Sequence, residues 1–420
     1  DYKALVCLLL AGGNDSFNML VPRSGASYQE YAKTRSNLAL PKGDLLPIHF
    51  TDKNGKQFGL HPSMPEVQKL FNDKKLSFIS NVGTLVEPTS KTQYLNGSVS
   101  LPVGLLSHAD QIQQWQSSIP QMRSSKGWGG RIADILQAGN GNQNISMNIS
   151  LSGTNTFQVG KSATEYAIRS SAGGSVGIQV LEGTSALDKA LSKGAKSLLA
   201  QQYQDIFKST FTNKIKDSQA SHEEFSTALQ QAPMLKTSFS DNPVSANMEL
   251  IAKTIAVRDT LNVSCQTFFI NFGGWDHHDN VLDNQVAMLS VVSKALSEFQ
   301  KAMEELDLAN QVTTFTCSDF GRTLTSNGNG SDHAWGGNVM VMGDSVKGGQ
   351  IFGQYPSLAI NGKDDIGGTI LLPSLSTDEY FAELAQWFGL ANGDLNYVLP
   401  NIGHFYDVGS GGSPIGFMEV

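Results

Sequence analysis

The chain of 420 residues is 40% hydrophobic and 16% charged, which describes a folded protein with a sizeable core and excludes an intrinsically disordered chain. Its formal net charge of −8 argues against a nucleic-acid partner, because phosphate binding needs a basic face and none is visible. No run approaches the roughly 18 apolar residues that a membrane-spanning helix needs. We therefore expect no nucleic acid among the partners and no transmembrane segment.

The first third of the chain alternates strand and helix patterns. KALVCLLL predicts a buried strand, and the polar segment SGASYQEYAKTRSNLAL predicts a loop. MPEVQKLFNDKK predicts a helix with Pro65 near its first turn, and LSFISNVG predicts a second strand. Residues 3–82 are thus expected to form a strand–crossover–strand unit. Two further helices are expected at ADQIQQWQSS and GWGGRIADILQAG.

The middle of the chain has a different pattern. Residues 185–258 are rich in Ala, Lys, Gln and Leu at helical spacing, and short strands are expected near 145–183. We interpret residues 145–260 as a mainly helical insertion or cap within a single domain that spans 1–420. Whether these helices form a lid, a partner surface or a membrane-facing cap is open at this stage.

The alternating pattern returns after residue 263. VSCQTFFINFGG and QVTTFTCSDFG predict strands on either side of a long amphipathic helix, NQVAMLSVVSKALSEFQKAMEELDLA. VMVMG and the segment around GGTILLP predict later strands. Strands that alternate with helices are typical of an α/β fold, and their continuous apolar runs predict buried strands of an open, mostly parallel sheet.

Acidic and histidine residues follow the predicted strands at several places. Asp15 follows KALVCLLLAGGN, Asp276 follows QTFFINFGGW, and Asp319 follows VTTFTCS. In an open α/β sheet the carboxyl ends of the strands form the edge where ligands and metals bind. We therefore expect a metal-centred site there, with ligands drawn from Asp15, Asp276, His278, Asp319, Asp332 and His333.

The strongest local signal for a metal is FGGWDHHDN. Residues i and i+2 of an extended segment point to one side, so Asp276 and His278 could share one ion, although the sequence does not decide between His277 and His278. Carboxylate and imidazole suit Zn²⁺, Mn²⁺ or Fe, whereas carboxylates with carbonyls suit Ca²⁺. A surface loop with a hydrogen-bonded Asp–His pair is the plain alternative. For Asp15 the alternative is a turn-forming residue.

A second group of candidates lies in TFTCSDFGRT and SNGNGSDHAWGG. Arg322 could hold an anionic substrate with two hydrogen bonds, or it could neutralise Asp319 through a salt bridge. Asp332 and His333 follow Asp319 by 13 and 14 positions and form a plausible further set of ligands.

Ser107 is the candidate nucleophile, at the expected start of the ADQIQQWQSS helix. Backbone N–H groups and the helix dipole there favour an anion, and a metal lowers the pKa of a hydroxyl further. An ordinary N-cap serine is the competing interpretation. The adjacent His108 could be a ligand, a general acid or an exposed residue.

Taken together, these motifs resemble a known superfamily. SDFGR after an apolar strand resembles the Ser-Asp-His-Gly motif of the alkaline phosphatase and sulfatase superfamily, and MPEVQKLFNDKKLSFISNVG resembles its Pro-Asn-Leu-x-x-Leu helix and the strand after it. More closely, LLLAGGNDSFN, GLHPSMPEV, LLSHADQIQQW, GWGGRIAD, FGGWDHHDN, SDFGRT and GSDHAWGG occur in the order of a sulfatase-like bacterial family, a domain of unknown function that is commonly exported with a twin-arginine leader. The resemblance covers nearly the whole chain outside roughly 145–260.

The resemblance implies a doubly wound sheet of the alkaline phosphatase type with one or two divalent ions (Zn, Mn or Ca) at its edge. It also implies a periplasmic or secreted location. By motif, Asp15 matches the ligand of the first strand, Asp319 matches the Asp of Ser-Asp-His-Gly, and Ser107 falls where the superfamily keeps its nucleophile. Asp276 and His278 match the later ligand pair, and His333 matches the final histidine.

Two departures from the superfamily shape the functional hypothesis. Phe320 replaces the usual histidine, which puts one of two metal sites in doubt, and no Cys-x-Pro-x-Arg sulfatase signature is present. We expect a metal-dependent hydrolase of phosphate or sulfate esters, acting on a small or polymeric anionic substrate. His108 would protonate the leaving group, and Arg131 or Arg322 would hold the anion. The alternative is a non-catalytic, metal-stabilised protein that binds an extracellular polymer or glycan; the oligomeric state is unknown.

Overall fold

The structure is a computed structural model that describes residues 2–178, 181 and 185–419. Its strands are β1 Lys3–Ala11, β2 Leu20–Pro22, β3 Leu46–Thr51, β4 Gln57–Leu60, β5 Leu76–Gly83, β6 Asn148–Ser150, β7 Tyr166–Ala167, β8 Cys265–Gly273, β9 Val312–Ser318, β10 Gly337–Met342, β11 Ile351–Phe352 and β12 Leu375–Ser376. Its α-helices are α1 Gly25–Arg35, α2 Pro65–Asn72, α3 Lys91–Asn96, α4 His108–Ser117, α5 Trp128–Leu136, α7 Ala186–Ala200, α8 Ile206–Leu229, α9 Pro243–Ala256, α10 Val281–Glu305, α11 Thr377–Phe388 and α12 Leu395–Val398. Single-turn 3₁₀ helices occur at Ser36–Leu38, Gln137–Gly139, Ser170–Ala172, Asn392–Asp394 and Ile402–His404.

The centre of the fold is a mostly parallel sheet in the order β11-β5-β10-β9-β1-β8-β6-β7, with β12 also paired to β5. Strand β1 pairs in parallel with β8 and with β9, and β10 is antiparallel to both of its neighbours. The apolar run of β1 is buried on both faces, as expected for a central parallel strand. The predicted mixed α/β architecture with a large, mostly parallel sheet is confirmed.

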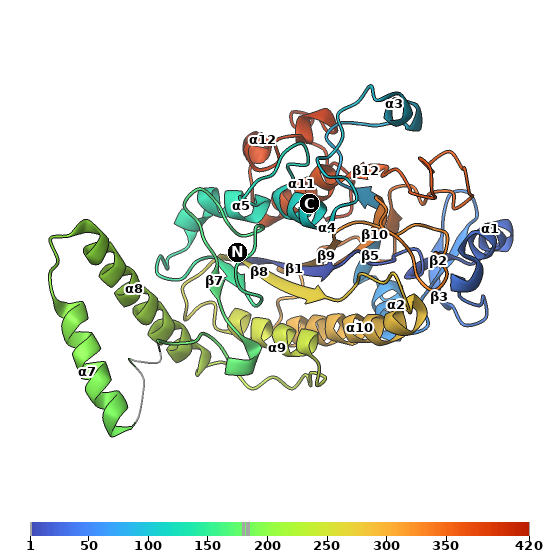
Figure 1. The fold of residues 1–420 in the computed structure, drawn as a ribbon. Helices are drawn as coiled ribbons and strands as arrows, with labels where there is room; N and C mark the ends of the chain where they lie inside the picture. Colours follow the sequence, from blue (N-terminus) through green and yellow to red (C-terminus); the bar gives the residue numbers. More distant parts are fainter. Residues whose placement is uncertain (1, 179–180, 182–184, 420) are drawn as a thin grey trace.

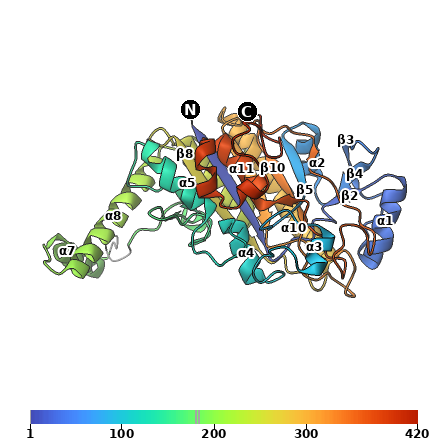
Figure 2. The same ribbon diagram turned by 90° about the horizontal axis from the view of Figure 1, so that it is seen from above.

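Helices cover both faces of this sheet (Figure 1). Helices α2, α9 and α10 lie against one face, and α4, α5 and α11 lie against the other. Alternate residues of β1 serve the two layers: Val6 and Leu8 belong to the apolar cluster with α9 and α10, whereas Leu5 and Leu9 pack with the cluster of α5 and α11. Figure 2 shows the same layers from above, with the sheet between them.

A second, antiparallel sheet in the order β2-β4-β3 lies at one end of the molecule, next to α1. The polar segment 24–40 was predicted as a loop, but it contains α1 and a 3₁₀ turn. The loop prediction was wrong because α1 has no regular apolar stripe; its packing rests on Tyr31 and the fully buried Arg35. The segment around GGTILLP also differs from its prediction, since Leu371 forms only an isolated bridge with Asp365.

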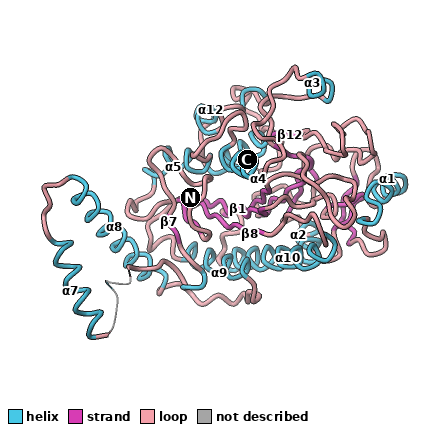
Figure 3. The backbone as a smooth tube through the Cα atoms, in the orientation of Figure 1, coloured by secondary structure: helices cyan, strands magenta, loops and turns pink. Residues whose placement is uncertain are grey.

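The middle of the chain has two parts. Its short strands β6 and β7 extend the main sheet beyond β8, and α9 packs beside α10. Helices α7 and α8 instead reach away from the body of the molecule, as the backbone tube makes plain (Figure 3). The division into a single domain 1–420 with an insertion at 145–260 stays a prediction. Among the described residues, no helix is long and apolar enough to cross a membrane.

Candidate metal centre

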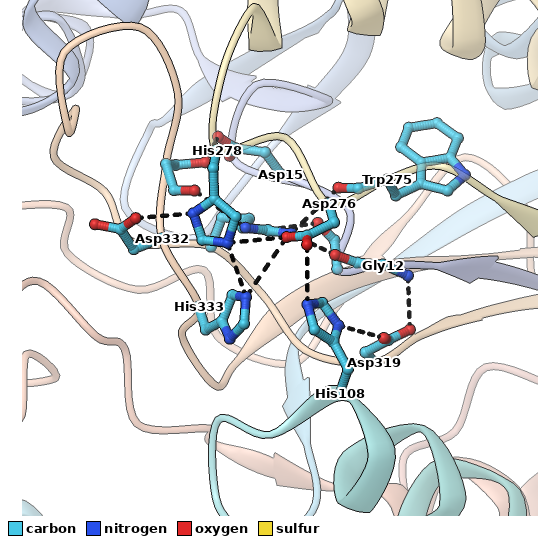
Figure 4. A network of polar contacts seen from close by, with 12 residues as sticks. Gly12, Asp15, His108, Trp275, Asp276, His278, Asp319, Asp332 and His333 are labelled. Atoms are coloured by element: carbon cyan, nitrogen blue, oxygen red, sulfur yellow. Dashed lines mark hydrogen bonds and ion pairs between the residues drawn. The ribbon is translucent and has the colours of Figure 1, made fainter.

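Four segments far apart in the sequence meet at the carboxyl edge of the main sheet (Figure 4). His108 is the first residue of α4, Asp276 follows β8, and Asp319 directly follows β9. The loop between β9 and β10 supplies Asp332 and His333. The parallel pairing of β8 and β9 with β1 brings the ends of these strands together, which is why the residues after them become neighbours.

Each histidine of the centre has its Nδ1 atom held by an oxygen. Nδ1 of His108 lies 2.8 Å from Oδ2 of Asp319, and Nδ1 of His278 lies 3.0 Å from Oδ1 of Asp332. Nδ1 of His333 lies 2.8 Å from the carbonyl oxygen of Leu106. Carbonyl and ionised carboxylate oxygens only accept hydrogen bonds, so all three Nδ1 atoms carry the proton. In the neutral ring each Nε2 then presents a lone pair.

These Nε2 atoms converge on the carboxylate of Asp276. Nε2 of His278 lies 3.0 Å from Oδ1, Nε2 of His333 lies 3.5 Å from Oδ1, and Nε2 of His108 lies 3.3 Å from Oδ2. The Nε2 atoms of His278 and His333 are 2.9 Å apart. Two lone pairs at that distance repel each other, so the arrangement needs a proton or a cation between them.

The donor set fits a metal ion. His108, Asp276 and His333 each offer one ligand atom, and the three atoms lie within 4.8 Å of one another. Nε2 of His108 is buried and has no hydrogen-bond partner, as expected of an atom with a lone pair reserved for a cation. Imidazoles whose second nitrogen is held by a carboxylate or a carbonyl are the usual form of histidine ligands. The protein therefore contains a possible metal site at these three residues.

Asp276 is held in its ionised form by Arg322. The Arg322 side chain is fully buried and places Nη2 2.5 Å from Oδ1 of Asp276. Desolvation raises the pKa of this carboxyl, but the hydrogen bond and the charge of Arg322, with smaller contributions from His108 and His278, outweigh it and lower the pKa. The Asp276 side chain is 46% exposed, so its oxygens are accessible from solvent.

The remaining donors of Arg322 are taken by backbone carbonyls. Nε donates to Gly13 (2.8 Å), Nη1 donates to Ser331 (3.0 Å), and Nη2 also donates to Gly12 and Trp275. The guanidinium thus ties together the loops after β1, β8 and β9, and each of its three nitrogens donates to a protein group. Arg322 does not form the expected salt bridge with Asp319; it pairs with Asp276 instead.

Asp319 is 2% exposed and supports the centre from behind His108. Its Oδ1 accepts a hydrogen bond of 2.9 Å from the backbone N–H of Gly12, and its Oδ2 receives the proton of His108 Nδ1. Gly12 has φ +122°, and a Cβ at this position would lie 2.5 Å from the backbone nitrogen of Asp276. Only glycine permits this close approach of the turn after β1 to the Asp276 loop.

Phe320 forms an apolar wall beside the centre. Its ring centroid lies 4.8 Å from that of His108 and 4.7 Å from that of His333. The side chain is 2% exposed. Where the related motif carries a second histidine, this chain therefore has a buried phenyl ring that packs against two imidazoles and offers no ligand atom.

Asp15 does not belong to the cluster, although the sequence predicts it as a ligand. Its carboxylate is buried at 1% exposure, forms an ion pair of 2.5 Å with Nη2 of Arg35 and accepts a hydrogen bond of 3.0 Å from Ser331. Arg35 lies in α1, the helix that was predicted as a loop, so no sequence pattern pointed to this partner. Both contacts use Oδ2, whereas the buried Oδ1 has no hydrogen-bond partner, and the ligand role of Asp15 stays a prediction.

Arg131 also lies elsewhere, in α5. It is buried, and its guanidinium donates to the carbonyls of Val398 (2.8 Å), Lys126 (3.0 Å) and Ser117. Burial lowers the pKa of Arg131 to about 10. Every nitrogen of the group has a backbone partner, so the predicted role as an anion clamp gives way to one of joining α4, α5 and α12.

Ser107 and His277 flank the centre without entering its contacts. Ser107 is the N-cap residue of α4. The hydrogen bond from Arg123, with a smaller contribution from Ser107, lowers the pKa of the nearby Asp110. His277 is 4% exposed, and neither of its ring nitrogens has a hydrogen-bond partner. Between the two neighbouring histidines, His278 is the one that faces the cluster.

Comparisons with known proteins place the chain in a family. Among solved structures it is similar to the PsFucS1 sulfatase from Pseudoalteromonas sp. (11% identity over 94% of this chain and 69% of that chain, TM-score 0.38) and to Ps i-CgsB in complex with k-i-k-neocarrahexaose (9%, 93% and 72%, TM-score 0.37). It is also similar to a mutant of TAB5 alkaline phosphatase (11%, 95% and 99%, TM-score 0.32). No curated protein matches the sequence. The family profile that matches does so over residues 2–399, and the chain belongs to that family, the proteins of unknown function DUF1501.

Proposed function

We propose that this protein is a metal-dependent hydrolase of phosphate or sulfate esters that acts outside the cytoplasm. The observation that carries the proposal is the convergence of three imidazole Nε2 atoms on the carboxylate of Asp276, each ring fixed through its Nδ1 atom. A prearranged donor set of this kind, open to solvent at the edge of an α/β sheet, is typical of catalytic metal sites. The location outside the cytoplasm rests on the family resemblance alone.

The donor set favours one transition-metal ion, with Zn²⁺ as the first candidate. Three nitrogens and one carboxylate suit Zn²⁺, Mn²⁺ or Fe²⁺, whereas Ca²⁺ prefers six to eight oxygens. A second ion would need ligands on the far side of Asp276, where the guanidinium of Arg322 already balances the charge. The phenyl ring of Phe320 occupies the other flank. We therefore expect one ion per chain, held by His108, Asp276 and His333 with His278 beside them.

A bound divalent ion would supply Lewis-acid polarisation of the ester. The side chains around it would do the rest. Asp319 fixes the ring of His108, and Arg322 keeps Asp276 ionised. Ser107 supplies a hydroxyl at the start of α4, next to His108, and is the proposed nucleophile; a water molecule is the alternative. The side chain of His108 is 33% exposed and so borders the solvent at the site.

A second candidate function is a metal-stabilised protein that binds an extracellular polymer or glycan without turnover. It is favoured by one observation: every nitrogen of Arg322, the cation in contact with Asp276, donates to protein groups. A hydrolase of anionic esters usually offers free donors to the ester oxygens. Under this alternative the same ion would serve recognition instead of chemistry.

The first experiment measures the metal content of protein purified without chelator or metal-affinity resin, by elemental mass spectrometry. We expect one equivalent of Zn, Mn or Fe in the wild type and less than about a tenth of that in Asp276→Asn and His333→Ala, because both remove a ligand. His49→Ala is the matched control, since this exposed histidine of β3 lies outside the centre. The proposal would be wrong if the protein contained no stoichiometric metal even after it was soaked with divalent metal ions.

Turnover then separates the two candidates. The metal-loaded wild type should hydrolyse generic aryl phosphate or aryl sulfate esters, and Ser107→Ala should abolish turnover while keeping the metal if the hydroxyl is the nucleophile. Unchanged turnover in Ser107→Ala would assign the attack to water. Stoichiometric metal with glycan binding and no turnover would instead establish the binding protein.

A further inference from the structure

The second unusual region is the helical arm, defined here as residues 186–217, which comprises α7 and the first half of α8. It projects from the body on the side opposite α1 (Figures 1 and 2). The C-terminal half of α8 attaches it, through the buried residues Ser221, Phe225 and Ala228. Within the described part of the arm, Ser192 is the only buried residue, so almost every arm side chain meets solvent.

The arm exposes large apolar side chains. In α7 these are Leu187 (68% exposed), Leu191 (52%) and Leu198 (58%); in α8 they are Ile206 (73%), Phe207 (82%) and Phe211 (68%). Other exposed apolar side chains of the described chain, such as Leu95, Met122, Val286 and Ile360, are scattered singly over different elements. A concentration of this kind marks an interaction surface, whereas single exposed apolar residues do not.

Helix α7 has an apolar face and, opposite to it, a basic face. Leu187, Leu191 and Leu198 have the i, i+4, i+11 spacing that places them on one helix face. Lys189, Lys193 and Lys196 lie on the opposite face and are all exposed. An apolar stripe of leucines backed by lysines is the pattern of helices that lie in the plane of a membrane surface.

The charge of the arm is opposite to that of the rest of the protein. Its six lysines outnumber its three aspartates, a net charge of +3 in a chain whose total is −8. None of these lysines forms an ion pair with another residue in the part of the chain that the structure describes. A basic arm on an acidic body is attracted to an anionic surface while the body is repelled, which would orient the molecule arm-first.

An open apolar cavity of about 410 Å³ lies between the two helices of the arm. Leu198, Leu199, Phe211 and Ile215 line it, and Lys208 stands among them. The cavity adds apolar surface next to the exposed leucines and places an ammonium group beside it. This combination suits a phospholipid, which offers an apolar chain and an anionic headgroup together.

We propose that the arm binds the surface of an anionic phospholipid bilayer, with its apolar side chains in the interface and its lysines near the headgroups. A second copy of the chain is a poorer occupant for two reasons. Pairing arm against arm would bring two basic surfaces together. The described body offers no comparable apolar patch, since its exposed apolar residues are isolated.

The test is co-sedimentation of the full chain with vesicles of phosphatidylcholine containing about a quarter phosphatidylglycerol, against pure phosphatidylcholine vesicles. We expect binding to the anionic vesicles that weakens with salt and falls about tenfold or more in Leu187→Ser/Phe207→Ser/Phe211→Ser. The charge variant Lys189→Gln/Lys193→Gln/Lys196→Gln should fall in the same direction. Leu95→Ser/Met122→Ser is the matched control, because it removes exposed apolar side chains outside the arm.

Two outcomes would overturn the proposal. One is no binding to anionic vesicles, or equal loss of binding in the control variant. The other is a wild-type protein that is dimeric by light scattering and becomes monomeric in the arm variant without vesicle binding, which would make the arm a contact between copies. All three arm substitutions are at exposed positions, so unchanged thermal unfolding verifies that each variant is folded.

Discussion

The candidate metal centre and the helical arm are both open to solvent, but they are built in opposite ways. In the centre every imidazole has a partner at Nδ1, and five protein groups hold the guanidinium of Arg322. In the arm, residues 186–217, large apolar side chains and lysines are exposed, and almost none of the arm's side chains is buried. A site that must hold a small ion needs side chains fixed in advance, whereas a surface that meets a fluid bilayer does not.

The contrast separates two kinds of stability. Loops that converge on Arg322 cannot move independently, because one buried cation ties the turns after three strands together. The arm has almost no buried side chains of its own, so it can open without unfolding the sheet. Substitutions at the centre should therefore change global unfolding, and substitutions in the arm should not.

The largest expected effect is that of Arg322→Ala. It leaves the carboxylate of Asp276 without its partner and removes the hydrogen bonds to the carbonyls of Gly12, Gly13 and Ser331. We expect the free energy of unfolding to fall by about 3–5 kcal/mol, because buried carbonyls lose their donor and the removed side chain leaves a cavity. Urea unfolding followed by circular dichroism measures it.

Arg123→Ala is the matched control for this substitution. Arg123 pairs with Asp110 at 2.7 Å, but its side chain is 74% exposed, so we expect a much smaller loss of stability than in Arg322→Ala. If the two variants lost the same stability, the guanidinium of Arg322 would not be the tie between the loops that its contacts indicate.

A smaller effect is expected for Asp319→Asn. The amide still fits beside the N–H of Gly12, but it no longer accepts the His108 proton with a full negative charge, so the ring is held less firmly. We expect the affinity for Zn²⁺ to fall by about 10–100-fold, the usual consequence of removing such a supporting carboxylate. Competition with a chromophoric chelator measures this affinity.

Asp332→Asn provides the comparison for that measurement. Asp332 supports His278 in the same manner, yet it is 55% exposed, whereas Asp319 is 2% exposed. Water can replace the exposed carboxylate, so its loss should reduce the affinity less than that of Asp319. Equal losses, or no loss in Asp319→Asn, would contradict the idea that burial of the supporting carboxylate fixes the ligand.

The sequence predicted the sheet better than the site. The apolar runs of β1, β5, β8 and β9 are buried in the main sheet, and those four strands are confirmed. Because parallel strands finish at one edge, the ends of β8 and β9 bring Asp276 and Asp319 together. His108 of α4 and His333 of the β9–β10 loop join them there. The sequence pattern could not predict which charged side chains pair with each other. Asp15 and Arg322 were both candidates for chemistry, and each forms an ion pair with a residue in a distant or unrecognised segment.

The helical arm shows a second limit of prediction from sequence patterns. Helical periodicity predicted helices in residues 185–258, and α7, α8 and α9 lie there. Periodicity could not say which apolar faces are covered, because that depends on tertiary packing. Residues of α9 such as Met248 and Ile251 are fully buried against the body, whereas Leu187 and Phe207 in the arm are exposed. Helices with similar apolar spacing can therefore be buried in one place and exposed in another.

The smallest expected effect is that of Gly194→Ala in the middle of α7. A Cβ at this position would have no neighbour within 4 Å, so the change adds helix propensity of about 0.5–1 kcal/mol without new contacts. We expect slower amide hydrogen exchange in α7 alone, with an unchanged transition in global urea unfolding, because the arm opens independently of the sheet.

Gly130→Ala, in helix α5, is the comparison variant for Gly194→Ala. Its Cβ would lie 2.1 Å from the carbonyl carbon of Val159, so the same substitution should destabilise the whole molecule. If Gly194→Ala instead shifted the global transition by as much as Gly130→Ala, in either direction, the arm would be part of the cooperative core. Its exposed leucines would then need an explanation other than a surface waiting for a membrane.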